Sequence, residues 1–287
     1  MKNRMTPAQL RSAKGRGRPL TMITAYDYPS ALIVDRSPVE MILVGDSLGN
    51  NVLGYEGTAR VTMDEMLHHV AAVARGATHT MVIGDMPFGS YNVSIERTME
   101  HADALIQAGA DCVKFEGGAA FAETARALVS RGIAVIGHIG LTPQTVHPRN
   151  WRVSGRDKAT AATIMRDAAA LDKAGVSALV LEAVPYPLAA QITARVAMPT
   201  IGIAAGPHCD GQVMIWHDLL GLNDETLHHV KQYLTLKDTI GEALARYCTD
   251  VEGGFFPTTA HGYRMEAEEL AAAIREAGGS PSIVKEG

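Results

Sequence analysis

The chain has few of the features that mark secreted, membrane or nucleic-acid-binding proteins. Its three cysteines, Cys112, Cys209 and Cys248, are odd in number and widely spaced, which fits neither a disulfide framework nor a thiolate metal site. No apolar run approaches the length of a membrane span, and no signal-peptide pattern follows the N-terminus. The net charge of -5 gives no reason to expect a nucleic-acid partner. We therefore expect a cytoplasmic protein with no membrane and no nucleic acid among its partners.

The N-terminal segment departs from this mild acidity. Thr6 followed by Pro7 is typical of a helix N-cap and first helical position, so a short helix is predicted there. Because basic runs are usually solvated, we expect the segment as a whole to be an exposed arm. Its six cations, with no acid among the first eighteen residues, are Lys2, Arg4, Arg11, Lys14, Arg16 and Arg18.

Short β-rich runs alternate along the chain with segments of helical spacing. The helical segments include 62–76, 94–109, 119–131 and 158–175. Strands and helices that alternate without interruption pair in parallel through right-handed crossovers. Eight such units in one undivided chain favour an α/β fold of the closed kind, the (βα)8 TIM barrel, over an open doubly wound sheet. The eight runs lie at 21–26, 41–46, 79–85, 111–116, 133–138, 177–182, 199–204 and 213–217.

The domain organisation follows from the even composition. No linker divides the 287 residues, so we predict a single (βα)8-barrel domain over 1–287, with the barrel at about 20–222. C-terminal helices are predicted within about 227–277, on helical spacing at 227–248 and 265–277, before a flexible tail at 278–287. Neither a GxGxxG motif after the first strand nor a Walker motif occurs, so no nucleotide-binding motif supports the open-sheet alternative.

Ionisable residues stand at the C-terminal ends of successive apolar runs. Because a parallel barrel brings these ends to one rim, we expect the side chains to meet there. A single acid after a strand usually caps the next helix, but five groups in register on successive strands are harder to explain by capping. Three buried carboxylates near one point also need a cation. The residues are Asp46, Asp85, Glu116, His138 and Glu182, with Lys114 two positions before Glu116.

The donor atoms narrow the choice of cation and of reaction. Carboxylates without a Cys/His cluster suit a hard ion such as Mg2+ or Mn2+, which keeps several waters, better than they suit zinc. Such an ion can accept the oxygens of a 2-oxo acid and stabilise the enolate left when a neighbouring C–H proton is removed. Glu182, flanked by the apolar Leu181 and Val184, suits the general base. The competing interpretation pairs Glu182 with a structural Arg or Lys.

Several other histidines, Asp218 and the methionines have structural interpretations. His68 and His69 lie in the middle of a predicted helix and are expected to be surface or packing residues. His217 and Asp218 are expected to close the eighth strand, where they either cap or line the rim. The thirteen methionines are scattered at apolar positions and are expected to fill the core.

Motifs spread along the chain give it a resemblance to a known family. They are TAYDY at 24–28, VGDSLG at 44–49, VTMDEM at 61–66, VARGA at 73–77, VKFEGG at 113–118, GHIGLTPQ at 137–144, VLEAVP at 180–185 and DGQV at 210–213. In order and spacing the sequence resembles the ketopantoate hydroxymethyltransferases over about residues 20–257. The combination of GDSLG with GHIGLTPQ is far more specific than a single glycine motif.

The resemblance implies a site and a reaction. Asp46 and Asp85 match direct ligands of one Mg2+ per subunit that also contact the substrate, and Glu116 matches a carboxylate that holds the metal through water. Glu182 matches the base that removes the C3 proton of 3-methyl-2-oxobutanoate. The enolate would take a one-carbon unit from 5,10-methylenetetrahydrofolate and give 2-dehydropantoate (ketopantoate), on the route to pantothenate. Family members are homodecamers built as a pentamer of dimers. The residues that match the family's remaining contacts to the 2-oxo acid or its product are Tyr26, Ser47, Lys114 and His138.

Several loops depart from the family pattern, whereas the metal and base positions do not. These loops are expected to cover the site or to bind folate, so the identity of the one-carbon donor is the part of the function that they affect. The departures are GTAR at 57–60, Ala204 in place of a glycine, RNWRVSGR at 149–156 and AHGY at 260–263.

Two alternative functions stay open beside the transferase. One is another Mg2+-dependent enzyme that forms the enolate of a 2-oxo acid, a lyase or mutase of the isocitrate lyase and phosphoenolpyruvate mutase group. The other is a non-catalytic barrel paralogue kept for assembly or binding. Tetrahydrofolate-dependent conversion of 3-methyl-2-oxobutanoate separates the three.

Overall fold

The computed structural model describes residues 3–147 and 150–279, in two compact units, Met1–Leu234 and Thr235–Gly287. In the first unit eight parallel strands follow one another around a closed barrel. The predicted TIM barrel is therefore confirmed. That all 287 residues form one domain stays a prediction.

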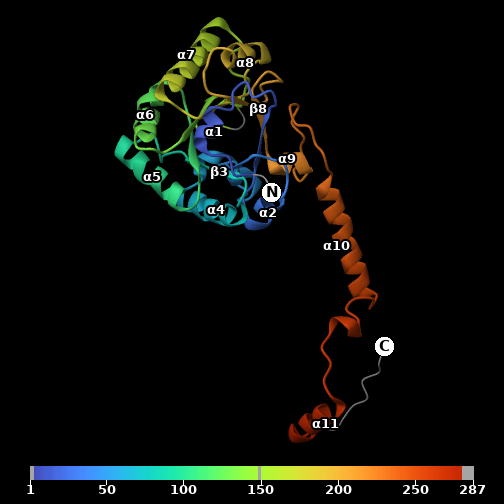
Figure 1. The fold of residues 1–287 in the computed structure, drawn as a ribbon. Helices are drawn as coiled ribbons and strands as arrows, with labels where there is room; N and C mark the ends of the chain where they lie inside the picture. The colour runs from blue at the N-terminus through green and yellow to red at the C-terminus, as the bar shows by residue number, and fades with distance from the viewer. Residues whose placement is uncertain (1–2, 148–149, 280–287) are drawn as a thin grey trace. The chain divides into compact units, whose positions relative to one another are not determined.

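The strands run in chain order around the barrel, and pairing of β1 with β8 closes it. They are β1 (Leu20–Thr24), β2 (Met41–Val44), β3 (Met81–Asp85), β4 (Cys112–Glu116), β5 (Val135–Gly140), β6 (Ala178–Glu182), β7 (Thr200–Ile203) and β8 (Gly211–Met214). Helices cover the outside of the barrel (Figure 1). They are α2 (Tyr28–Asp35), α4 (Met63–Gly76), α5 (Ile95–Gln107), α6 (Ala122–Ser130), α7 (Lys158–Ala174) and α8 (Tyr186–Thr193). Shorter elements are α1 (Pro7–Arg11), α3 (Leu48–Asn51), α9 (Trp216–Leu220), η1 (Thr58–Arg60) and η2 (Ala119–Phe121).

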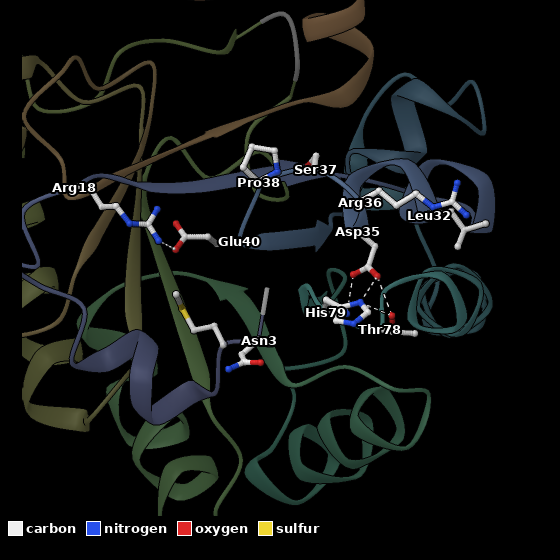
Figure 2. Close-up of a pocket in the computed structure, with 11 residues that line it drawn as sticks. Asn3, Arg18, Leu32, Asp35, Arg36, Ser37, Pro38, Glu40, Thr78 and His79 are labelled. Carbon is white, nitrogen blue, oxygen red and sulfur yellow. Dashed lines mark hydrogen bonds and ion pairs between the residues drawn. The ribbon is translucent and has the colours of Figure 1, made fainter. Parts of the chain in front are cut away.

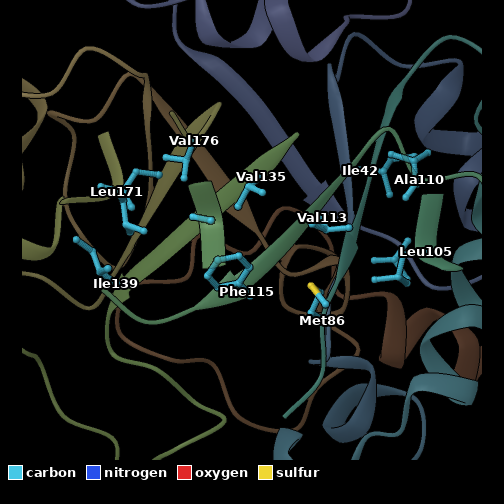
Figure 3. Close-up of a cluster of buried hydrophobic side chains, with 14 of the residues drawn as sticks. Ile42, Met86, Leu105, Ala110, Val113, Phe115, Val135, Ile139, Leu171 and Val176 are labelled. Carbon is cyan, nitrogen blue, oxygen red and sulfur yellow. The ribbon is translucent and has the colours of Figure 1, made fainter. Parts of the chain in front are cut away.

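Alternation along each strand divides the core into two parts. Outward-facing residues such as Ile42, Val113, Phe115 and Val135 pack with helical side chains such as Leu105 (Figure 3). A second cluster takes the alternate positions of the same strands, among them Met41, Cys112 and Ile136, and fills the barrel interior. Because side chains alternate between the faces of a strand, polar residues at the same alternate positions as this second cluster also point into the barrel.

Helix α1 closes the N-terminal end of the barrel. Thr6 and Gln9 form a capping box at its start, in which the Gln9 N–H donates to Oγ1 of Thr6 and the Thr6 N–H donates to Oε1 of Gln9. Leu10, fully buried on this helix, belongs to the interior cluster with Met22 and Met81. The predicted short helix is confirmed, and its Leu10 side chain fills the N-terminal end of the barrel interior.

The expectation of a solvated basic arm is wrong for the described residues. Arg11 meets Asp172 of helix α7, whereas Arg4, Lys14 and Arg16 meet acids that stand directly before a strand, at the end of the barrel opposite the predicted rim. Such carboxylates need a counter-charge because the strand starts are partly buried. Lys2 lies outside the described residues. The pairs are Arg4–Asp111, Lys14–Asp210 and Arg16–Glu40, with N···O distances of 2.6, 2.8 and 2.6 Å.

Asp35, the last residue of α2, anchors the start of β3. Its carboxylate accepts hydrogen bonds from the backbone N–H of His79 (2.8 Å) and from the hydroxyls of Thr78 and Thr80 (2.9 Å each). Burial alone would raise the pKa of Asp35, but these hydrogen bonds outweigh it and hold the pKa well below its usual range. Asp35 and the Arg18–Glu40 pair border a cavity of about 940 Å3 at this end of the barrel (Figure 2).

Strand β8 begins two residues earlier than the sequence predicts. It was predicted at 213–217, but the pairing with β1 begins at Gly211, opposite Leu20, and ends at Met214. The backbone N–H of Trp216 donates to Oγ1 of Thr24, where helix α9 starts. His217 therefore lies in a helix and does not close the strand.

The second unit holds helix α10 (Leu236–Glu252), the short η4 (Thr259–His261) and helix α11 (Ala267–Glu276). Helix α11 agrees with the predicted 265–277, whereas the helix predicted at 227–248 begins nine residues too early. The segment before it follows α9 instead, since the Tyr233 N–H donates to the carbonyl of Leu219 (2.9 Å). In the described part of the chain, no helix is both long and apolar enough to cross a membrane. Residues 280–287 of the predicted tail lie outside the described residues.

Candidate active site

Strand register places the predicted side chains of β3, β4 and β5 beside one another. Lys114 and Glu116 are two positions apart on β4, so both point into the barrel. In the parallel pairing, Asp85 stands opposite Lys114 and His138 stands opposite Glu116. All four are buried. Adjacent strands thus bring two acids, a lysine and a histidine to one rim, as predicted.

Asp46 reaches the same rim from the turn after β2. Its backbone N–H donates to Oδ2 of Asp85 (3.1 Å), which fixes the turn against β3. The Asp46 side chain is buried with the others. Two carboxylates from neighbouring strands therefore lie side by side, as the sequence predicts.

Lys114 provides the positive charge closest to these acids. Its Nζ lies 2.8 Å from Oδ1 of Asp85, but off the hydrogen-bonding direction, so this buried oxygen has no hydrogen bond in the described structure. Burial works to lower the pKa of Lys114, but Asp85, Glu116 and Asp46 together raise it above its usual value. Lys114 is thus charged at neutral pH.

The carboxylates outnumber this single cation. Burial raises the pKa of Asp85 to about 7, with Lys114 opposing and Asp46 adding to the shift. Burial likewise raises the pKa of Glu116 well above its usual value, and the charge of Asp46 adds to it. Two neighbouring buried acids with raised pKa values would need additional positive charge nearby to be ionised together. A bound cation would supply it.

His138 links this cluster to Glu182 on β6. Its Nδ1 lies 3.5 Å from Oε1 of Glu116, and its Nε2 lies 3.2 Å from Oε2 of Glu182. Burial, and then the charge of Lys114, lower the pKa of His138, so the imidazole is neutral at pH 7. Glu182 is more open than the other acids, with its side chain 20% exposed. In the described residues Glu182 meets this imidazole and forms no ion pair with an Arg or Lys.

Tyr26 and Ser47 meet beside Asp46. The Tyr26 hydroxyl and Oγ of Ser47 are 2.9 Å apart, and Nδ1 of His69 lies 2.6 Å from the Tyr26 carbonyl oxygen. His69 thus has the packing role expected of it. Burial raises the pKa of Tyr26, so its hydroxyl stays protonated.

A cavity of about 450 Å3 opens at this rim. Tyr26 is not among its lining residues and stands behind Ser47, so the predicted contact of Tyr26 with substrate stays a prediction. The predicted site residues that line the cavity are Asp46, Ser47, Asp85, Lys114, Glu116, His138 and Glu182.

Several loops that depart from the family pattern also line this cavity. Thr58, Trp151, Arg152 and Ala204 all do so, whereas AHGY at 260–263 belongs to the second unit. Ala204 has φ of +53°, a left-handed conformation that costs a residue with a Cβ on the order of 1 kcal/mol. A glycine would avoid that cost, so Ala204 is a strained residue at the rim.

Two buried residues at the site escaped the sequence-based prediction. Gln144, in the segment after β5, donates from Nε2 to Oδ2 of Asp46 (2.9 Å), and the Tyr91 hydroxyl donates to Oε1 of Gln144 (2.6 Å). Gln144 is the last residue of the GHIGLTPQ motif, and this motif is the sequence feature that could have identified it as a site residue. Tyr91 lies in no motif, so the sequence held no signal for it.

The donor set fits a hard divalent cation with few protein ligands. Within residues 3–147 and 150–279, no three His, Cys, Asp or Glu side chains converge closely enough to hold a metal by themselves. An ion would therefore bind two protein carboxylates and fill its shell with water or substrate oxygens, as Mg2+ commonly does. The Oδ1 of Asp85, buried without a hydrogen bond, is a suitable donor atom.

Comparison with known proteins places these residues in a family context. Residues 4–259 match the family model described as ketopantoate hydroxymethyltransferase. A 3-methyl-2-oxobutanoate hydroxymethyltransferase of Moorella thermoacetica is 52% identical over 266 residues, which cover 92% of this chain and 99% of the relative. An enzyme of the same name from Chloroflexus aurantiacus is 50% identical over 273 residues, 94% of this chain and 97% of the relative.

Solved structures show the same barrel at low sequence identity. A phosphonopyruvate hydrolase superposes with a TM-score of 0.60 at 13% identity, covering 96% of each chain. A 2,3-dimethylmalate lyase of the phosphoenolpyruvate mutase and isocitrate lyase superfamily superposes with a TM-score of 0.54 at 14% identity, covering 95% of this chain and 96% of the other. At such identities the likeness establishes the fold alone.

Proposed function

Because the chain belongs to the ketopantoate hydroxymethyltransferase family, we propose that it transfers a hydroxymethyl group from 5,10-methylenetetrahydrofolate to 3-methyl-2-oxobutanoate and gives 2-dehydropantoate. Membership confirms the predicted family and the prediction that the chain is a transferase. The observation that carries the proposal is one cavity lined by Asp46, Asp85, Lys114, Glu116 and Glu182. Such a set can bind a cation and an anionic substrate and can accept a proton.

Asp46 and Asp85 would hold a Mg2+ ion directly, and Glu116 would hold it through water. Bound there, the ion would act as a Lewis acid toward the keto and carboxylate oxygens of the 2-oxo acid. The excess of buried carboxylates over the single ammonium of Lys114 supports this assignment. Mn2+ would fit the same donors.

Lys114 and Ser47 would bind and orient the 2-oxo acid. Lys114 stays protonated beside its acids, so it can attract an anion into a site that also contains carboxylates. The Ser47 hydroxyl lines the cavity and is held by Tyr26, which limits its rotation. Together they would fix the face of the substrate that meets the base.

Glu182 would remove the C3 proton of 3-methyl-2-oxobutanoate. Glu182 must be a carboxylate to accept this proton, and the neutral imidazole of His138, with Nε2 3.2 Å from Oε2, would help to orient it. The electron pair of the C–H bond becomes the enolate, whose C3 would form the new carbon-carbon bond to the methylene carbon. The two C–N bonds of that carbon to the folate break, water supplies the hydroxyl oxygen, and tetrahydrofolate leaves. The loops that contain Thr58, Trp151 and Arg152 border the space left for folate.

Assembly and location complete the proposal by resemblance to the family. We propose a homodecamer, a pentamer of dimers, in the cytoplasm. The lyase and mutase alternative keeps only the support of a shared barrel fold, because its structural relatives are 13–14% identical.

A two-part experiment tests the proposed function. In D2O with Mg2+ and no folate, the protein should exchange the C3 proton of 3-methyl-2-oxobutanoate, which proton NMR detects. With methylenetetrahydrofolate added, ketopantoate should form. Exchange without ketopantoate would keep the enolate chemistry and reject the transferase. No exchange and no ketopantoate would reject both.

A further inference from the structure

Gln144 is a buried amide at the centre of the carboxylate cluster. Only 4% of the residue is exposed. Its Nε2 donates to Oδ2 of Asp46 (2.9 Å) and to the carbonyl of Met86 (3.0 Å), and its Oε1 accepts from the Tyr91 hydroxyl (2.6 Å). Its backbone N–H donates to Oε2 of Glu116 (3.1 Å). One residue therefore contacts two of the three acids assigned to the metal.

The chemistry of its partners fixes which way the Gln144 amide faces. The Asp46 carboxylate and the Met86 carbonyl can only accept hydrogen bonds, so the NH2 group must face them. The carbonyl end then faces Tyr91, whose hydroxyl can donate. Both N–H donors and the acceptor of the side chain are thus used, which leaves the amide one orientation.

These contacts leave one oxygen of each acid for other ligands. Gln144 takes Oδ2 of Asp46 and Oε2 of Glu116. Gln144 does not contact the other two oxygens, Oδ1 of Asp46 and Oε1 of Glu116, and the latter lies 3.5 Å from Nδ1 of His138. We infer that Gln144 is a positioning residue that orients Asp46 and Glu116 for the cation, with Tyr91 locking its amide. This inference rests on the metal site of the proposed function.

A simple packing role would not require this arrangement. An apolar side chain of similar length would fill the same volume, and the backbone N–H would still bind Glu116. What such a side chain cannot do is donate to Asp46. Removing hydrogen-bond partners that orient metal ligands typically costs about 10–100-fold in metal affinity. Metal affinity therefore separates the two roles.

The experiment measures Mn2+ binding to the full-length protein by calorimetry, without 2-oxo acid or folate. Gln144→Met removes the donor to Asp46 at nearly constant length and should weaken Mn2+ binding about 10–100-fold. Tyr91→Phe leaves the ring contacts with Phe115 and Phe121 in place and removes only the hydroxyl that donates to Gln144. We expect a smaller loss of Mn2+ affinity from this change. Thr145→Val is the matched control, because among the described residues the Thr145 hydroxyl bonds only to Thr142, within the same turn. Its Mn2+ affinity should equal that of the unchanged protein.

Two further readouts fix the outcome. At saturating Mn2+, the C3 exchange rate of Gln144→Met should return toward that of the unchanged protein, because the defect lies in binding the ion. A lowered thermal unfolding midpoint with unchanged Mn2+ affinity would make Gln144 a structural residue and overturn the inference. If Gln144→Met does not fold, unchanged affinity in Tyr91→Phe overturns it. If the unchanged protein binds no Mn2+, the metal assignment fails, and the ketopantoate assay reports separately on transfer.

Discussion

The ammonium of Lys114 lies 2.8 Å from Oδ1 of Asp85, and the two side chains are 4% and 1% exposed. The two residues are opposite one another in the pairing of β3 with β4. A lysine this deep stays charged only because of the acids around it, so cation and acids depend on each other. Under the proposed function, this pair would lie where the anionic substrate binds.

Lys114→Met should impair binding of the 2-oxo acid. Loss of one hydrogen bond to a charged group costs about 1.5–3 kcal/mol, so KM should rise, or kcat/KM fall, by roughly ten-fold or more. Steady-state kinetics measure it. Lys173→Met, on the exposed face of α7, should leave both constants unchanged. Equal kinetics in the two variants would remove Lys114 from the substrate site.

Asp46→Asn and Asp85→Asn should each abolish activity while the barrel stays folded. Each change keeps the shape of the side chain and removes one charge from a cluster that already has too many. Activity and circular dichroism are measured together. Chelation of the unchanged protein should have the same effect and Mg2+ should reverse it. Full activity after thorough chelation would exclude the metal.

Glu182→Gln should lose C3 exchange in D2O by roughly a hundred-fold or more, the usual contribution of a general base. The amide keeps the shape and the contact distance to His138 but cannot accept the proton. Proton NMR of 3-methyl-2-oxobutanoate follows the rate. Glu123→Gln, an exposed acid on α6, is the control. If exchange continues undiminished in Glu182→Gln, the base lies elsewhere, with His138 the next candidate.

Asp35→Asn should lower stability in a pH-dependent way. Because its pKa is lower in the folded protein than in the unfolded chain, Asp35 contributes stability above the unfolded value of about 3.9, and this contribution is lost as pH falls. Urea unfolding should show a deficit of about 1–3 kcal/mol for the variant at pH 7. The deficit should shrink between pH 5 and pH 3. A constant deficit would mean that packing, not charge, is responsible.

The rim acids were predictable because they obey local rules. Strands β3, β4 and β6 each end in their acid, and the two-residue spacing of Lys114 and Glu116 gives both the same direction. Parallel pairing then determines which strands are neighbours. The roles of Gln144 and Tyr91 could not be derived in this way, since Gln144 meets Asp46 across 98 residues of sequence.

Errors arose where tertiary contacts override local pattern. The apolar run that ends at His217 resembles a strand end, but the hydrogen bond from Trp216 to Thr24 turns the chain into a helix. The basic N-terminus has the composition of a solvated arm, and only the folded barrel brings Asp111 and Asp210 to it. Charge patterns predict partners poorly when the partners are distant in sequence.

The ion pairs between the N-terminal cations and the acids at the strand starts can form only late in synthesis. Lys14 leaves the ribosome 196 residues before Asp210, the acid that it binds, and β1 likewise waits for β8 before its open edge is paired. Contacts this far apart form late because the loop they close is long. During synthesis the growing barrel therefore has an unpaired edge at β1, and the N-terminal cations lack their acidic partners. The barrel can close only when nearly all of its strands have been made.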